Sequence, residues 1–187
     1  MLALIAALLA VAPTYLDEPT AYQNVRAALA ASRETGVDVK LLLAIGYIES
    51  RYDPHALSRC EGAVGSGCGR VYGAWPGNEP PPKARPSWFC GVMQVGGDVT
   101  WTECQRLRAD LAGNYMAGAK HLVWWSNIPE CRGKPKDERL NCALQGYNGG
   151  YPAINMNYRR YVDMVMWMTG KIRRVLPAGD REPSPAI

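Results

Sequence analysis

The chain has 187 residues, of which 48% are hydrophobic and 20% charged, and this suits one globular domain of ordinary size. The composition excludes an intrinsically disordered or fibrous protein. The formal net charge of +4 is too small to identify an anionic partner. The chain also has no basic cluster interleaved with aromatic residues, so we expect no nucleic-acid partner. We further expect a monomer.

Six cysteines occupy positions 60, 68, 90, 104, 131 and 142. None of them forms a C-x-x-C pair and the chain has only two histidines, so we expect no zinc site, no other metal and no cofactor. An even number of cysteines in a Gly- and Pro-rich chain favours disulfides and therefore a secreted or periplasmic location. Six buried free thiols are the alternative.

Residues 1–12 are almost wholly apolar, but they are too few for a membrane-spanning helix, which needs roughly 20 residues. Ala10-Val11-Ala12 has the small-x-small pattern of a signal-peptide cleavage site, although no Lys or Arg precedes the apolar run. The alternative is an uncleaved first helix that packs on the core or associates loosely with a membrane. We treat residues 1–19 as an N-terminal segment that is either a signal or an anchor.

Residues 20–176 form the predicted domain, and helical periodicity begins near Thr20. Gly36 ends this first helix of the domain, and Asp38 caps a second. Apolar residues cover so much of the second helix that it must be largely buried. Later helices are expected over 102–112, 114–126, 138–147 and 157–175, before a flexible Pro-rich tail at 177–187.

Residues 57–90 are rich in glycine and proline, which excludes a helix and predicts a long inserted loop. Three of the cysteines fall in this loop, so disulfides would staple it down. Strand signals are weak throughout, and we expect no more than one small hairpin inside the loop, in a fold of the mainly α class. The aromatic residues of the loop that could stack on a ligand, or pack beneath the loop, are Tyr72, Trp75 and Trp88.

Glu49 is the acidic residue that ends the predicted buried helix. Partial burial and the negative end of the helix dipole both disfavour a charged carboxylate there. A glutamic acid that stays protonated near neutral pH can give a proton to a leaving oxygen. Taken alone, a glutamate in a last helical turn is more often a solvated surface residue.

The residues around Glu49 form part of a larger pattern. Ile48-Glu49-Ser50-Arg51-Tyr52-Asp53-Pro54 resembles the E-S-x-x-(N/D)-P element that ends the catalytic helix of soluble lytic transglycosylases and goose-type lysozymes. Further similar elements follow it in the family's order, and together the matches lie in register over residues 22–168, which makes chance a poor explanation. The further similar elements are Gly91-Val92-Met93-Gln94-Val95, Asn114 with Gly118-Ala119-Lys120-His121-Leu122, Ala143-Leu144-Gln145-Gly146-Tyr147-Asn148-Gly149-Gly150, and Tyr161-Val162-Asp163-Met164-Val165.

The resemblance implies a lysozyme-like helical domain, encoded by a bacterium or a phage, that acts on the glycan strands of peptidoglycan. Such an enzyme cleaves the β-1,4 bond between N-acetylmuramic acid and N-acetylglucosamine and leaves 1,6-anhydromuramic ends. Glu49 would be the single catalytic acid and base, and Ser50 a structural hydrogen-bonder at the helix end. The residues that would bind or position the glycan are Gly91, Met93, Gln94, Tyr147, Asn148 and Tyr161.

Asp98 leaves a second mechanism open, because goose-type lysozymes keep an acidic residue near this place. It could activate water and make the protein a hydrolase, or it could cap a helix that begins at Val99. Gly96 and Gly97 predict a flexible segment beside it, and this favours the anhydro product because a base must be held close to its water. A glycan-binding module without turnover is the third possibility.

Overall fold

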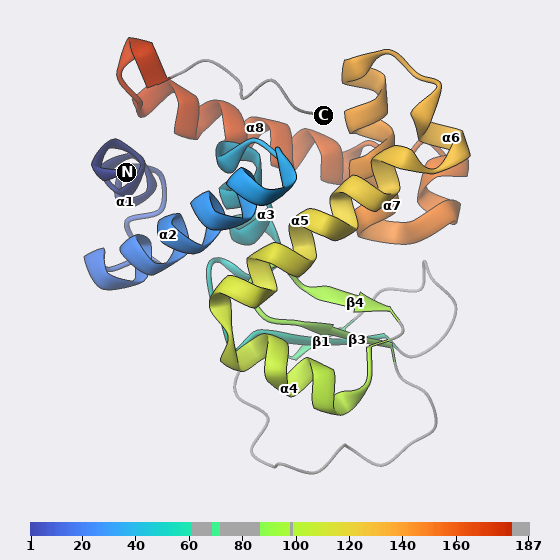
Figure 1. Ribbon diagram of the computed structural model, residues 1–187, viewed down its shortest axis with the longest axis horizontal. Coiled ribbons are helices and arrows are strands. Elements are labelled where there is room, and N and C mark those ends of the chain that lie inside the picture. Colours follow the sequence, from blue (N-terminus) through green and yellow to red (C-terminus); the bar gives the residue numbers. More distant parts are fainter. Residues whose placement is uncertain (61–68, 72–86, 98, 181–187) are drawn as a thin grey trace.

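The computed structural model describes residues 1–60, 69–71, 87–97 and 99–180. Most helices gather on one side of the molecule, and a small sheet with helix α4 lies on the other (Figure 1). The helices are α1 (Leu2–Val11), α2 (Glu18–Thr35), α3 (Val39–Ser50), α4 (Trp101–Ala109), α5 (Leu111–Asn127), α6 (Pro129–Arg132), α7 (Lys136–Asn155), α8 (Arg160–Val175) and the 3-10 turn η1 (Ala178–Asp180).

The described strands form one antiparallel sheet in the order β2-β1-β3-β4. Their bounds are β1 (Leu57–Cys60), β2 (Gly69–Val71), β3 (Ser87–Cys90) and β4 (Val95–Gly97). The mainly α class is confirmed, but the sheet is larger than the single hairpin that the sequence predicts. Each strand has only three or four residues, which is too short to show alternating hydrophobicity clearly.

Helix α3 is central, as its apolar sequence predicts. Residues 39–46 are all buried, and the helix packs against α2 on one side and α8 on the other. Helix α5 crosses the molecule and contacts both α2 and α7. Helix α7 is longer than predicted, and it changes direction at Gly150, whose φ of 65° lies outside the helical region.

The N-terminal segment belongs to the packed structure. Leu8 of α1 is fully buried, and the helix contacts α2 and α8. This is the packing expected of an uncleaved first helix, while cleavage after Ala12 stays a prediction. Among the residues that the structure describes, no helix is long and apolar enough to span a membrane.

The end of the domain is held by a lysine from the central helix. The Lys40 ammonium donates to the Asp180 carbonyl at 2.9 Å, and residues 178–180 form the 3-10 turn η1. The predicted flexible tail is therefore ordered at its start, whereas residues 181–187 lie outside the described part of the chain.

Of the three aromatic residues predicted in the inserted loop, the structure describes Trp88. Trp88 on β3 is 5% exposed, and its ring packs against that of Trp101 with the centroids 5.0 Å apart. This burial leaves the Trp88 ring almost no surface for stacking on a ligand, so that expectation is wrong for this residue, whereas packing beneath the loop stays a prediction. Tyr72 and Trp75 lie outside the described residues, as does most of the inserted loop.

Two disulfides confirm the prediction of paired cysteines for four of the six. Cys90–Cys104 joins β3 to α4, and Cys131–Cys142 joins α6 to α7. The Cα atoms are 5.5 Å apart in each pair. The Cys60 side chain and all of Cys68 lie outside the described residues. The loop is thus stapled at its Cys90 end, to a helix that follows it.

We expect unreduced protein to show no reactive thiols, and reduction to lower its melting temperature. Each described disulfide closes a short loop, and such a bond commonly contributes about 2–4 kcal/mol to the free energy of unfolding. Alkylation in denaturant before and after reduction, followed by mass analysis, counts the thiols. Recovery of six alkylated cysteines from unreduced protein would contradict the pairing.

Candidate active site

Glu49 lies in the last turn of α3, where the buried part of the helix ends and the chain turns away. Arg51 stops the helix in the left-handed conformation, with φ of 57°. The Glu49 side chain is half-buried. Tyr161 of α8 donates its hydroxyl proton to Glu49 Oε1 at 2.5 Å, and Tyr161 itself is only 3% exposed. A buried phenol therefore restrains the orientation of the carboxyl group.

Tyr147 reaches the same place from α7. Its hydroxyl donates to the Met93 carbonyl at 2.6 Å. Burial raises the pKa of Tyr147 well above that of a free tyrosine, and the nearby Glu49 charge raises it further. The phenol therefore stays protonated, and it remains a hydrogen-bond donor beside the Glu49 carboxyl.

Ser50 ties the end of α3 to the turn that follows β3. Its buried hydroxyl lies 3.1 Å from the Gly46 carbonyl and 2.9 Å from the Val92 carbonyl, and it can donate its one proton to either. The first bond belongs to the helix and the second to the turn. Ser50 thus fixes the end of α3, which carries Glu49, against the turn over residues 91–94.

The turn over residues 91–94 needs unusual backbone geometry at both ends. Gly91 has φ of 71° and Gln94 has φ of 46°, both in the left-handed region. A Cβ at Gly91 would also meet the Asn114 side chain, so a larger residue does not fit there. Met93 is fully buried and lies against Gly118 of α5, which gives its side chain a packing role.

Gln94 supports this turn from inside. Its Nε2 donates to the Gly91 carbonyl at 2.8 Å, and its Oε1 accepts the Ser58 hydroxyl proton at 2.5 Å. The residue is 7% exposed. Each end of the amide therefore makes a bond within the protein, and the role of Gln94 in binding the glycan stays a prediction.

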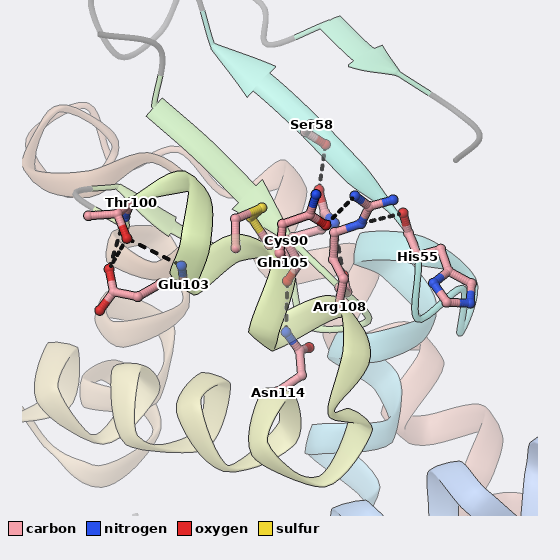
Figure 2. The surroundings of a disulfide bond; sticks show 11 residues. His55, Ser58, Cys90, Thr100, Glu103, Gln105, Arg108 and Asn114 are labelled. Atoms are coloured by element: carbon pink, nitrogen blue, oxygen red, sulfur yellow. Dashed lines mark hydrogen bonds between the residues drawn. A yellow bond between two sulfur atoms is a disulfide. The ribbon is translucent and has the colours of Figure 1, made fainter. Parts of the chain in front are cut away.

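Asn114 has no predicted role, yet it anchors the turn. From α5 its Oδ1 accepts the Met93 N–H at 2.7 Å, and its Nδ2 donates to the Cys90 carbonyl at 2.8 Å. Figure 2 shows its side chain pointing at Cys90, beside the disulfide. The residue is completely buried. Its place in the N-x-x-x-G-A element was the available signal, since periodicity alone marks it only as a buried helix position.

We expect Asn114→Ala to lower the free energy of unfolding by about 2–4 kcal/mol, because two buried backbone groups lose their partners. For a chain of this length that corresponds to a fall in melting temperature of roughly 6–12 °C. Asn127→Ala is the matched control on the same helix, since its exposed amide donates to the Val123 carbonyl of its own helix. Equal melting temperatures for the two variants would contradict the anchoring role.

Asp98 and the two glycines before it follow β3 and precede α4 in the chain. Asp98 itself lies outside the described residues, so its role as a second carboxylate stays a prediction. The expectation that it caps a helix is wrong, because Thr100 caps α4 and accepts the N–H of the third helical residue. The expected flexible glycines, Gly96 and Gly97, belong to β4 and pair with β3.

The predicted residues therefore converge from four separate segments. Glu49 and Ser50 end α3, the turn between β3 and β4 holds Met93, and Tyr147 and Tyr161 lie on α7 and α8. Asn148 follows Tyr147 on α7 and is exposed. In the described part of the chain, no group of His, Cys, Asp and Glu side chains is arranged to hold a metal ion. The arrangement offers one oriented carboxyl group with phenols beside it.

Comparisons with protein-family models, with curated proteins and with solved structures find no match to this chain.

Proposed function

We propose that the protein cleaves the glycan strands of peptidoglycan by the lytic transglycosylase reaction, with Glu49 as the catalytic acid and base. One observation carries this proposal: the Tyr161 hydroxyl bonds to the Glu49 carboxyl, although the two residues come from the first and the last elements of the sequence pattern. Ser50 ties the turn to the end of α3, and Tyr147 of α7 bonds to the same turn and lies close enough to Glu49 for that charge to raise its pKa further. The motifs that support the resemblance thus meet in space.

The chemistry requires a carboxyl group that both gives and takes a proton. Protonated Glu49 would donate to the glycosidic oxygen as the bond to the muramic acid C1 breaks, and the acetamide group of the sugar would stabilise the positive charge. The Glu49 carboxylate would then remove the proton from the 6-hydroxyl of the same sugar. The 6-oxygen closes onto C1, which leaves a 1,6-anhydro ring and restores the protonated Glu49.

The surroundings of Glu49 suit these two steps. Its half-buried position limits the solvation of the charged form, and the Tyr161 hydroxyl restrains the carboxyl group in one orientation. Tyr147 is held by the Met93 carbonyl and so presents its ring at a constant place beside the carboxyl. A positioned acid beside rigid aromatic groups is what protonation of a bound sugar needs.

A zymogram on purified cell wall, with binding to insoluble peptidoglycan measured in parallel, tests the proposal. Clearing of the gel is the expected result. Binding without clearing would favour the non-catalytic glycan-binding module. Neither binding nor clearing would overturn the proposal. The two disulfides fit the secreted or periplasmic location that a cell-wall enzyme requires.

A further inference from the structure

Five ring side chains of α5 and α7 form a continuous row that leads away from the candidate active site. We call this set, His121, Trp124, Trp125, Tyr147 and Tyr151, the aromatic row. His121 meets the Tyr147 ring edge-on with centroids 5.3 Å apart, and Trp125 lies 6.0 Å from His121. The row therefore begins at Tyr147, the phenol whose pKa the Glu49 charge raises.

The outer end of the row lies at the surface. Trp125 contacts Tyr151 with centroids 5.3 Å apart and Trp124 with centroids 4.7 Å apart. Trp124 is 54% exposed and Tyr151 is 43% exposed, whereas Trp125 is only 6% exposed. Two aromatic side chains thus present open surface on a buried support.

The inner rings are held firmly in place. The Trp125 indole N–H donates to His121 Nε2 at 2.7 Å. On the other side, a Cβ at Gly146 would collide with the Trp125 ring, so the α7 backbone lies directly against it. Rigid aromatic support lowers the conformational entropy lost when a ligand stacks on the exposed rings.

The chemistry of the row favours an uncharged ligand with apolar faces and polar edges. Burial lowers the pKa of His121, and its Nε2 accepts a hydrogen bond, so the imidazole is neutral. The other members of the row carry no charge at neutral pH. They offer flat apolar faces with indole N–H and phenol groups at the edges. N-acetylated sugar rings have this combination of C–H faces and polar substituents.

We infer that the aromatic row extends the glycan-binding surface beyond Glu49, with Trp124 and Tyr151 stacking on N-acetylated sugar rings of the same strand. This inference rests on the proposed function, because the strand reaches the row from Tyr147. It makes Trp124 a residue that determines affinity for long strands rather than the rate of bond cleavage.

The outer face of α8 provides the comparison surface. An open depression there is lined by Arg160, Asp163, Met164 and Trp167. Trp167 is 53% exposed, almost the same as Trp124, but the Lys171 ammonium lies over its ring at 4.4 Å. This tryptophan lies on the charged outer side of α8, whereas Tyr161 is on the buried side. Trp167→Ala is therefore a control matched in residue type and exposure.

The experiment measures binding of an N-acetylglucosamine hexasaccharide by calorimetry, with Glu49→Gln in every protein so that no turnover occurs. Trp124→Ala should weaken binding about tenfold, which is typical of truncating an aromatic anchor, whereas Trp167→Ala should leave it unchanged. Tyr151→Ala should act in the same direction as Trp124→Ala. With Glu49 intact, Trp124→Ala should raise KM for peptidoglycan and leave kcat within twofold.

The results distinguish failure of the aromatic row from failure of the catalytic proposal. Equal hexasaccharide affinities for Trp124→Ala, Tyr151→Ala and the control, in a protein that degrades peptidoglycan, would overturn the aromatic row and leave the catalytic proposal intact. Weakened binding in a protein that degrades nothing would support the row and overturn catalysis. No binding of the hexasaccharide by any of the proteins would overturn the row directly.

Discussion

Replacing Glu49 with glutamine is expected to remove nearly all turnover of peptidoglycan, by about a thousandfold or more, while the fold and glycan binding are retained. The amide has the shape of the carboxyl group, and its oxygen can still accept the Tyr161 hydroxyl proton that the structure directs at Glu49 Oε1. It has no acidic proton for the glycosidic oxygen, however, and no carboxylate for the 6-hydroxyl. Both chemical steps are therefore lost together.

The measurement is the release of soluble fragments from purified peptidoglycan, with melting temperature and binding to insoluble cell wall as checks of folding. Glu34→Gln is the matched control, because Glu34 also lies in the last turn of a long helix, α2, but is exposed. The control should retain full activity. A Glu49→Gln variant within tenfold of the unaltered protein would exclude Glu49 as the catalytic acid.

The helices were the part of the fold most accessible from sequence. Helix α3 is buried as its continuous apolar run predicts, and α8 follows the amphipathic pattern over nearly its whole length. The strands were not accessible in the same way, because the described strands are three or four residues long and lie in a Gly- and Pro-rich region. The pairing of β1 with β3 also joins residues far apart in the chain, such as Leu57 and Cys90, which no local pattern records.

In the candidate site, too, local sequence patterns identify some residues and miss those whose role depends on tertiary packing. Glu49 could be singled out by its place at the end of a buried helix, but Tyr161 lies in the apolar stripe of α8 and periodicity marks it only as core. Its hydroxyl becomes significant once α3 and α8 pack together. For Gln94 the resemblance implies contact with the glycan, and only the structure shows that its amide also bonds to the Ser58 hydroxyl and the Gly91 carbonyl.

The aromatic row shows what single-helix patterns omit. His121 and Trp125 are four residues apart on α5, so they share one face of that helix. Tyr147 and Tyr151 lie on either side of the change of direction of α7 at Gly150, so their sequence spacing does not predict a shared face. The sequence assigns His121 no role because it lies alone on a helix. Only the packing of α5 against α7 joins the two pairs into one surface.

Fragments released from peptidoglycan are expected to carry 1,6-anhydromuramic ends, each lighter by one water than the reducing end that a hydrolase leaves. This follows if Glu49 acts alone, because the 6-hydroxyl then takes the place of water at the muramic acid C1. The sequence pattern around Glu49 resembles that of lytic transglycosylases, in which a single carboxyl group performs both steps, and the bond from Tyr161 orients the Glu49 carboxyl. Mass analysis of the muropeptides distinguishes the two products directly.

Asp98→Asn completes the test, since the two mechanisms assign this residue opposite importance. If Glu49 works alone, the substitution should change the rate by less than about twofold, as expected for a carboxyl group outside the reaction. If Asp98 holds the attacking water, the rate should fall about a hundredfold, the loss that follows removal of a general base. Mass spectra with reducing ends, together with an inactive Asp98→Asn variant, would make the protein a two-carboxylate hydrolase in which Glu49 remains the acid.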